Sequence, residues 1–526
     1  MSTAEALQRP ISDIETAACR VVERIGVPVH ERATVAILES EGLRDADACL
    51  IEPGCQDLFA LGRVVHGRAL ELSESAATLS VAAPAPLAAP RAEWGRIMRT
   101  YVLGIGYSLP LIVLGLGVLV FGISLWGSPQ LSSPAKSGMA LGVLVSLVVS
   151  GPFTYAMTRR IFYYWYQYDP RALARTVARW TLAAIGCGAV CATIALAWST
   201  LVGSAPGFTV ALVAVLLLQG PIWTCTSALY VIGRAWVGGV ALVVPVVPLW
   251  LALRAGATPL PAHLLALAAA DALLIGATWW SLVQLPARSM PARDPLPASL
   301  MALSVGGFAA WGAVYYLLLF GDRLVAWVTP SGANFSPGYE TALELALIPL
   351  VFAMPILEFT LLRIAEQVEA LQDGAGFEHA ELLGIRIQHV LVRTVGAALV
   401  LYAGLSCLVL VLARETGRLL PDNAGVAVQH GAGWTALVTA LAAYGFLILG
   451  IGIGTVYQLV SRPWMLVRAG AIGVAVNLTV GAIARQGSGP QAAAFGLVAG
   501  TAAFALVMLV TWWTTRAKIA QWWAAT

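Results

Sequence analysis

Charged residues are scarce in this sequence: only 11% of its 526 residues are Asp, Glu, Lys or Arg. Soluble proteins hold about 25% charged residues, whereas 59% of this chain is hydrophobic. The composition excludes an ordinary soluble protein and indicates an integral membrane protein. The formal net charge of +3 is too small to indicate nucleic acid as a partner.

Catalytic and metal-binding motifs are missing as well. The chain contains no Walker A sequence, no Gly-x-Ser-x-Gly and no His-Glu-x-x-His. Its seven cysteines follow no zinc-module spacing, so we expect no metal, no cofactor and no disulfide. We predict that the protein is not an enzyme, and that its energy comes from another protein, an ion gradient or the synthesis of its substrate.

Long apolar runs dominate what is present. We predict an all-α polytopic membrane protein with twelve spans, each near the 20 residues that a helix needs to cross a bilayer. The fourth and fifth are the weakest, because they contain QGPIWTCTS and two prolines, respectively. The predicted spans are 101–125, 139–158, 180–202, 208–230, 235–253, 263–285, 299–320, 339–362, 390–413, 434–459, 465–485 and 492–513.

The distribution of basic residues predicts the topology. Eighteen Lys and Arg residues flank one set of span ends and six flank the other set. Because cytoplasmic loops carry an excess of Lys and Arg, we expect both termini to be cytoplasmic, in the inner membrane of a bacterium. The N-terminus does not have the basic start and apolar core of a signal peptide.

The predicted domain organisation has four parts. Residues 1–85 alternate short helical patterns with breaks, which indicates a small cytoplasmic helical module. Residues 86–100 are rich in Pro and Ala and are expected to form a semi-rigid linker. Six spans follow within 101–285 and six more within 299–520.

Acidic residues in the spans are the main candidates for a transport path. Ionisable residues in a membrane helix are costly and usually functional. Glu344 lies about five residues inside the eighth span, where it either reaches water at the interface or faces a hydrated cavity. Pro349 and Pro355 follow it and predict breaks in this helix, because each lacks a backbone donor.

Two further positions extend this set of candidates. Asp271 is the most deeply placed acid and needs a partner from another helix, either as a protonated structural group or as a functional site. Asp322 and Arg323 end the seventh span. Since adjacent residues do not face each other on a helix, each needs its own partner, in a gate or a polar cap.

An aromatic run, TRRIFYYWYQYDP, occupies residues 158–170 and includes Arg159. One interpretation is an aromatic belt at the cytoplasmic interface. The alternative is a stacking platform for sugar rings. The two interpretations are compatible in a protein that carries a polysaccharide.

Several blocks of the sequence resemble the Pel exopolysaccharide transporter family (PelG), a branch of the multidrug/oligosaccharidyl-lipid/polysaccharide (MOP) flippase superfamily. The similarity spans roughly residues 95–520. Arg363-Ile364-Ala365-Glu366 departs slightly from the family pattern, and the N-terminal module departs further. The blocks are SGPFTYAMTRRIF (150–162), IWTCTSALYVIGRAW (222–236), GDRLVAWV (321–328) and ELALIPLVFAMPILEFTLLRIAEQ (344–367).

The resemblance implies two six-helix lobes around a central cavity. It also implies transport of a cationic, amino-sugar-containing polysaccharide from the cytoplasm to the periplasm. The implied partners are membrane lipid, a cytoplasmic glycosyltransferase and a cyclic-di-GMP-responsive membrane protein. From it we expect an acidic cavity lining by Glu344, Asp271 and Asp322. The substrate-path candidates also include Arg323, Trp223 and Arg159.

Three functions therefore remain open. The first is an exopolysaccharide transporter, and the second is an ion-coupled antiporter or lipid-linked oligosaccharide flippase of the same superfamily. The third is a membrane-embedded glycosyltransferase or polymerase. Such enzymes usually have a large outer loop with catalytic acids, whereas the predicted outer loops here, 321–338 among them, are short.

Overall fold

The computed structural model describes most of the chain, in two compact units. The first unit comprises residues Met1–Arg96, Leu362–Val390 and Ala517–Ala525, and the second comprises Ile97–Leu361 and Leu391–Arg516. Described residues are 13–25, 30–41, 43–79, 120–166, 169–285, 298–329, 332–333, 336–372, 380–416 and 432–519, with scattered positions between 95 and 117.

The N-terminal helices pack into a small core of their own. α5 (Leu58–Leu79) contacts α2 (Ile14–Ile25), α3 (Glu31–Ser40) and α4 (Asp45–Ile51). Their buried apolar residues include Val21, Leu38 and Leu61. Arg20 on α2 also forms an ion pair of 2.9 Å with Glu41, which follows α3. The apolar faces of these amphipathic helices thus meet in one cluster.

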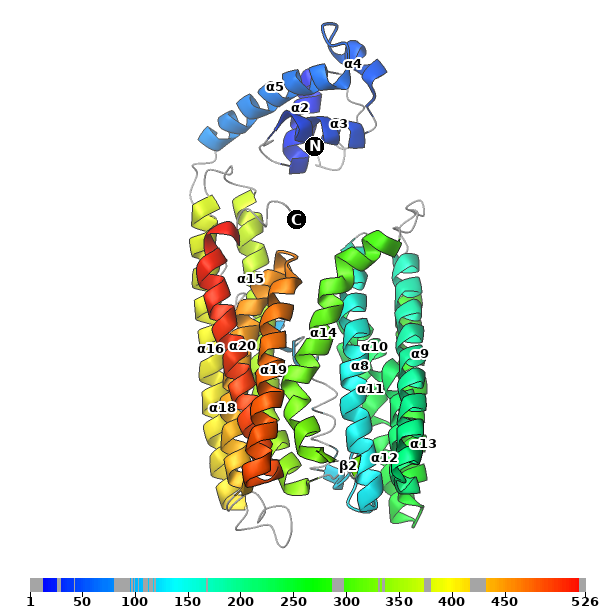
Figure 1. Cartoon of the computed structure of the whole chain (residues 1–526). Helices are drawn as coiled ribbons and strands as arrows, with labels where there is room; N and C mark the ends of the chain where they lie inside the picture. Colours follow the sequence, from blue (N-terminus) through cyan, green and yellow to red (C-terminus); the bar gives the residue numbers. More distant parts are fainter. Residues whose placement is uncertain are drawn as a thin grey trace. The chain divides into compact units, whose positions relative to one another are not determined.

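The second unit contains the membrane helices. In the described part of the chain, 11 helices are long and apolar enough to cross a bilayer, which confirms a polytopic all-helical protein. About half of the predicted first span, 101–125, lies outside the described residues, and its last positions, 122–125, belong to a turn and not to a helix. A two-stranded hairpin of β1 (Val328–Thr329) and β2 (Gly332–Ala333) lies at the lower end in Figure 1, here called the hairpin end.

The first lobe of this unit is built around α10 (Pro206–Val231). This helix packs against α8 (Ser133–Tyr166), α9 (Pro170–Val202) and α13 (Pro259–Val283). The predicted fifth span is α11 (Ala235–Val243) followed by α12 (Val246–Arg254), interrupted at Val244 and Pro245. Pro245 and Pro248 lack the N–H groups that a continuous helix would use there.

The second lobe begins with α14 (Ala298–Trp327), which contacts α19 (Pro463–Ser488) and α20 (Ala494–Thr515). α15 (Pro337–Gln372), α16 (Ala380–Thr416) and α18 (Ala432–Leu459) complete it. The short η3 (Pro490–Ala493) precedes α20, and η4 (Arg516–Lys518) follows it. Figure 1 shows the two lobes of the membrane unit, with α14 beside α8 where they meet.

Local sequence signals set the ends of the long helices. α9 begins after Asp169, whose side chain accepts a hydrogen bond of 2.9 Å from the Ala172 N–H, and Pro170 takes the first helical position. α9 ends at Gly203, which has a φ of 69°. Glycine adopts this left-handed conformation without a steric penalty.

The expected helix breaks at Pro349 and Pro355 do not occur. α15 continues through both residues from Pro337 to Gln372. Each proline removes one backbone hydrogen bond, and both are buried in the packed membrane unit. The neighbouring turns and the packing therefore hold the helix together, so the sequence prediction of breaks was wrong.

The lobes touch through glycine where α8 crosses α14. A Cβ added to Gly151 on α8 would lie 2.6 Å from the carbonyl oxygen of Gly312 on α14. A Cβ added to Gly312 would overlap the carbonyl oxygen of Gly151. The two backbones approach so closely only because both residues lack a side chain.

Candidate functional site

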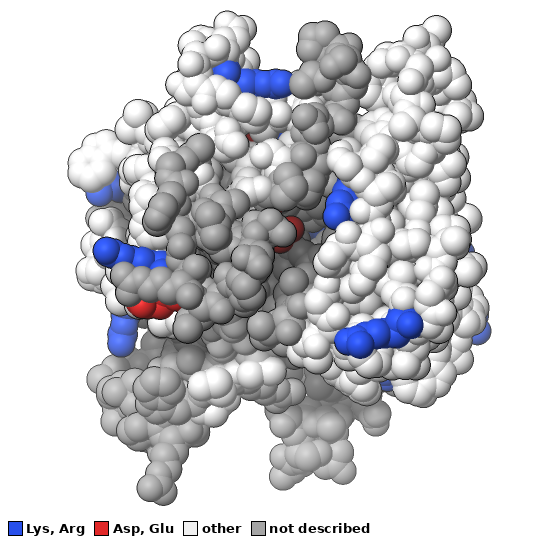
Figure 2. Space-filling view, turned by 90° about the horizontal axis from the view of Figure 1, so that it is seen from below, with Lys and Arg blue, Asp and Glu red and all other residues white. Residues whose placement is uncertain are grey.

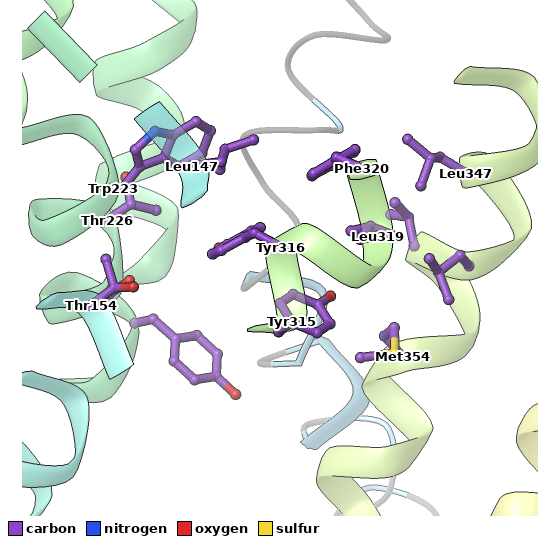
Figure 3. A pocket seen from close by; sticks show the side chains of 14 residues that line it. Leu147, Thr154, Trp223, Thr226, Tyr315, Tyr316, Leu319, Phe320, Leu347 and Met354 are labelled. Atoms are coloured by element: carbon purple, nitrogen blue, oxygen red, sulfur yellow. The ribbon is translucent and has the colours of Figure 1, made fainter. Parts of the chain in front are cut away.

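A cavity lies between the two lobes, with walls from four helices. The first lobe contributes side chains from α8 and α10, and the second contributes side chains from α14 and α15. Figure 3 shows these side chains converging from both sides. The lining residues are Leu147, Thr154, Trp223, Thr226, Ser227, Tyr230, Tyr315, Tyr316, Leu319, Phe320, Leu347, Leu350, Val351 and Met354.

The wall of this cavity is aromatic and hydroxylated. Five of its residues are aromatic, and three carry aliphatic hydroxyl groups. Of the described residues that line it, none is acidic or basic. The three acids expected to line it, Glu344, Asp271 and Asp322, are thus not among the described lining residues. The wall suits a neutral ligand with both flat apolar faces and hydrogen-bonding groups.

The aromatic side chains of α14 form a continuous series along the helix. The ring centroids of Trp311 and Tyr315 are 5.9 Å apart, and those of Tyr315 and Tyr316 are 5.1 Å apart. Tyr316 then stacks on Phe320, with centroids 6.4 Å apart and planes within 5°. Tyr315, Tyr316 and Phe320 of this series line the cavity, whereas Trp311 stacks on Phe504 of α20.

The series ends at a buried group of charges. The guanidinium carbon of Arg323 lies 4.7 Å from the Phe320 ring centroid. Its Nε is 3.0 Å from Oε2 of Glu340 on α15. On the preceding position, Asp322 accepts a hydrogen bond of 2.5 Å from the Tyr339 hydroxyl. Adjacent residues of α14 thus take separate partners on α15, as the sequence predicted.

This charged group has unused hydrogen-bonding capacity. Asp322 is fully buried, and Arg323 and Glu340 are 5% and 6% exposed. Among the described residues, Oδ1 of Asp322, Oε1 of Glu340 and the Tyr444 hydroxyl have no hydrogen-bond partner. Buried polar groups are costly without partners. The ion pair between α14 and α15 is therefore essential to the local charge balance.

Glu344 lies on α15 beyond the cavity wall. It precedes Leu347 and Val351, two lining residues, by three and seven positions. Residues at these spacings share a helix face, so Glu344 continues the lining face by one turn toward the hairpin end. Its side chain is exposed, and it interacts electrostatically with Arg323. Figure 2 shows acidic atoms near the centre of the face seen from below.

Asp271 lies in the first lobe and does not line the cavity. Its side chain on α13 is 6% exposed, and Oδ1 has no hydrogen-bond partner among the described residues. A buried hydrogen bond of 3.1 Å from Thr181 to Thr224 joins α9 to α10 in the same lobe. Asp271 is thus separate from the second-lobe charges.

Of the last two candidates from the sequence, Trp223 lies at the cavity and Arg159 lies away from it. Trp223 lines the cavity, and its Nε1 is 3.5 Å from the Ser146 hydroxyl oxygen. Arg159 does not line the cavity but donates a hydrogen bond of 2.8 Å to Ser461, between α18 and α19. Its guanidinium also lies 5.1 Å from the Phe308 ring centroid. Arg159 therefore joins the lobes away from the hairpin end.

Sequence reasoning missed several residues of the site. Glu340, Tyr339 and Tyr444 were not singled out. Glu340 lies four residues before Glu344 on the same helix face, a spacing that could have joined the two. Tyr315 and Tyr316 lie within the seventh span and carry no charge to draw attention to them.

Comparison with solved structures identifies the architecture. One match is a MATE transporter crystallised in a bent conformation, with a TM-score of 0.54 and 14% identity over 82% of this chain and 96% of that one. A MATE transporter of Vibrio cholerae matches with a TM-score of 0.52 and 12% identity, over 80% and 95%. The chain has the MATE fold.

The MATE fold is shared within the MOP superfamily. A MOP superfamily transporter from Pyrococcus furiosus matches with a TM-score of 0.52 and 11% identity, over 80% of this chain and 96% of that one. A multidrug resistance MATE family transporter of the MOP superfamily in an outward-facing conformation matches with a TM-score of 0.50 and 13% identity, over 81% of this chain and 96% of that one. No family model matches the sequence, and no curated protein matches it. The Pel branch therefore stays a prediction.

Proposed function

We propose that this protein is a transporter that moves a carbohydrate polymer across a membrane through the cavity between its lobes. The observation that carries the proposal is the cavity lining, whose described residues are all uncharged and include five aromatic residues and three with aliphatic hydroxyl groups. Pyranose rings present apolar C–H faces that stack on aromatic rings, and equatorial hydroxyls that pair with Ser, Thr and Tyr. The wall offers both kinds of contact from two opposite lobes.

The composition of the wall refines the substrate class. A cationic sugar would leave its charge without a counter-ion among the described lining residues, and an unpaired charge in a low-dielectric site is costly. An uncharged amino sugar, such as an N-acetylated hexosamine, meets no such penalty. Glu344, one turn beyond the wall, would then contact the chain near the cavity mouth.

The comparisons support a transporter but leave the substrate open. For the Pyrococcus furiosus transporter, the reverse polarity of its binding pocket is said to suggest a different function. This description supports the idea that the lining, rather than the fold, sets the substrate. The Pel-like sequence blocks favour an exopolysaccharide.

The remaining parts of the proposal come from the sequence. The arginine distribution supports an orientation with the hairpin end outside and both termini in the cytoplasm of a bacterial inner membrane. The N-terminal helices, which carry no catalytic motif, would then dock a cytoplasmic glycosyltransferase. A cyclic-di-GMP-responsive membrane protein would be the second partner.

The experiment is secretion of polymer per unit of inserted protein. Tyr316→Ala and Trp223→Ala should each reduce secretion by up to about tenfold, since aromatic stacking contributes on the order of 1 kcal/mol and 1.4 kcal/mol is a factor of ten. Tyr316→Phe should retain most activity. Phe446→Ala, which removes an exposed ring on α18, should have no effect.

An ion-coupled antiporter is the second candidate, favoured by the buried Asp271 with a free Oδ1 among the described residues. An Asp271→Asn variant in the same assay separates the two functions. If the protein carries a polymer through the cavity, Tyr316→Ala should lose secretion and Asp271→Asn should retain it. Normal secretion in Tyr316→Ala together with loss in Asp271→Asn would favour the antiporter.

A further inference from the structure

A short segment before α8, Gly122–Ser128, folds into a fixed turn, here called the strap. The Ser124 N–H donates a hydrogen bond of 2.8 Å to the Gly127 carbonyl. Gly122 has a φ of 71°, a conformation that glycine takes without penalty. Ile123 and Leu125 are 3% and 1% exposed. The strap is therefore part of the packed first lobe and not a loose loop.

A buried histidine of α13 fixes the strap. His263 is fully buried, with Nδ1 3.2 Å from the Leu125 carbonyl oxygen and Nε2 2.9 Å from the Ser128 hydroxyl. A carbonyl can only accept, so Nδ1 carries a proton. Nε2 of the neutral ring then accepts from Ser128. One side chain thus pairs with both sides of the turn.

The strap reaches the cavity through Trp126. The Trp126 ring stacks on Trp223, with centroids 6.4 Å apart and planes within 5°. Trp223 itself lines the cavity. Trp126 Nε1 is buried, with no hydrogen-bond partner in the described part of the chain. No other residue of the strap stacks on an aromatic residue of the cavity wall among the described contacts.

We infer that the strap is a positioning element of the transport site and that Trp126 is its positioning residue. Trp126 backs the Trp223 indole and holds it in the orientation in which it meets a sugar ring, while His263 holds the strap. The inference rests on the proposed carbohydrate substrate for its role in binding. The placement of Trp223 by Trp126 does not depend on that substrate.

The first test uses the purified full chain and the N-acetylglucosamine tetramer as probe, with affinity measured by calorimetry. Trp126→Ala should weaken binding by about tenfold, the scale of one lost stacking contact. Trp126→Phe should restore most of it. The matched control is Trp250→Ala, because Trp250 is half-buried on α12 and packs against Phe121 instead, with centroids 5.7 Å apart and the planes tilted by 53°.

The second test needs no sugar. Ser227 lines the cavity one turn from Trp223, and Ser227→Cys can be placed in a chain whose native cysteines are replaced. Trp126→Ala and His263→Leu should raise the rate of maleimide labelling several-fold, because the released indole no longer covers its neighbours. His263→Asn, whose amide can replace the Nδ1 donor, should label more slowly than His263→Leu.

The outcomes separate the two claims. If the unmodified chain does not bind the tetramer, the carbohydrate proposal fails and the labelling rates alone decide the role of the strap. If Trp126→Ala matches the parent in labelling, the positioning role is wrong. The positioning role is also wrong if Trp250→Ala changes the labelling rate as much as Trp126→Ala does. Where the tetramer binds, equal losses of affinity in these two variants would contradict the role as well.

Discussion

Gly312→Ala should abolish most polymer secretion and destabilise the protein. The added methyl would overlap the carbonyl oxygen of Gly151 and would lie 2.9 Å from Cδ2 of Tyr155. Because backbone cannot rotate away as a side chain can, α8 and α14 must separate. Overpacking of this kind costs about 1–3 kcal/mol, and it would displace Tyr315 and Tyr316, which follow Gly312 by one turn.

The matched control is Gly306→Ala on the same helix, where a Cβ would meet nothing within 4 Å. This variant should secrete normally and melt no lower than the parent, since alanine favours a helix over glycine by about 1 kcal/mol. The measurements are secretion per inserted protein and the melting temperature in detergent. Equal behaviour of the two variants would show that the glycine crossing is not required.

Arg323→Met should be the most destabilising single change in the charged group of α14 and α15. It would leave Asp322 and Glu340 buried without their cation. Removing one partner of a buried ion pair costs about 3–5 kcal/mol, whereas replacing both partners by apolar residues is often neutral. The double variant Arg323→Met/Glu340→Leu should therefore recover much of the lost stability.

Lys136→Met provides the control for this prediction, because the Lys136 ammonium donates to the carbonyl oxygen of Pro129, 3.0 Å away. Its loss should shift the melting temperature little. Thermal unfolding of the four purified proteins gives the comparison. If the double variant melts at a lower temperature than Arg323→Met, the loss of stability in Arg323→Met does not come from the broken ion pair.

The membrane architecture could be predicted because hydrophobic length is a local signal. Each span is read from its own residues, and the structure confirms the helical, polytopic class. Local signals are also misleading where packing decides. Pro349 and Pro355 indicate breaks in isolation, yet α15 continues through both.

The site could be predicted only in part. The sequence pointed to four residues that lie in or beside it, because charged residues in a span stand out. They are Trp223, Asp322, Arg323 and Glu344. The aromatic residues of the wall from Tyr315 to Phe320 were missed. An aromatic residue on a membrane helix gives the same sequence pattern whether it faces lipid, the protein core or a cavity. Only the packing of α14 against α8 selects the cavity.

The strap shows the same limit. Trp126 and His263 are 137 positions apart in the sequence, and no local pattern joins them. His263 stands at the start of the predicted sixth span, 263–285, and the sequence does not reveal that it is fully buried on α13. Long-range contacts of this kind follow from the fold, so the structure is needed to find them.

The most direct measurement of the central claim is photo-crosslinking during secretion. Tyr316 is replaced by p-benzoylphenylalanine, cells that produce polymer are irradiated, and the protein is probed for attached glycan. Leu273, an exposed apolar residue on α13, is the matched position outside the cavity. The account predicts a glycan adduct at position 316 and none at position 273. Secretion without an adduct at 316, or with equal adducts at both positions, would contradict a carbohydrate path between the lobes.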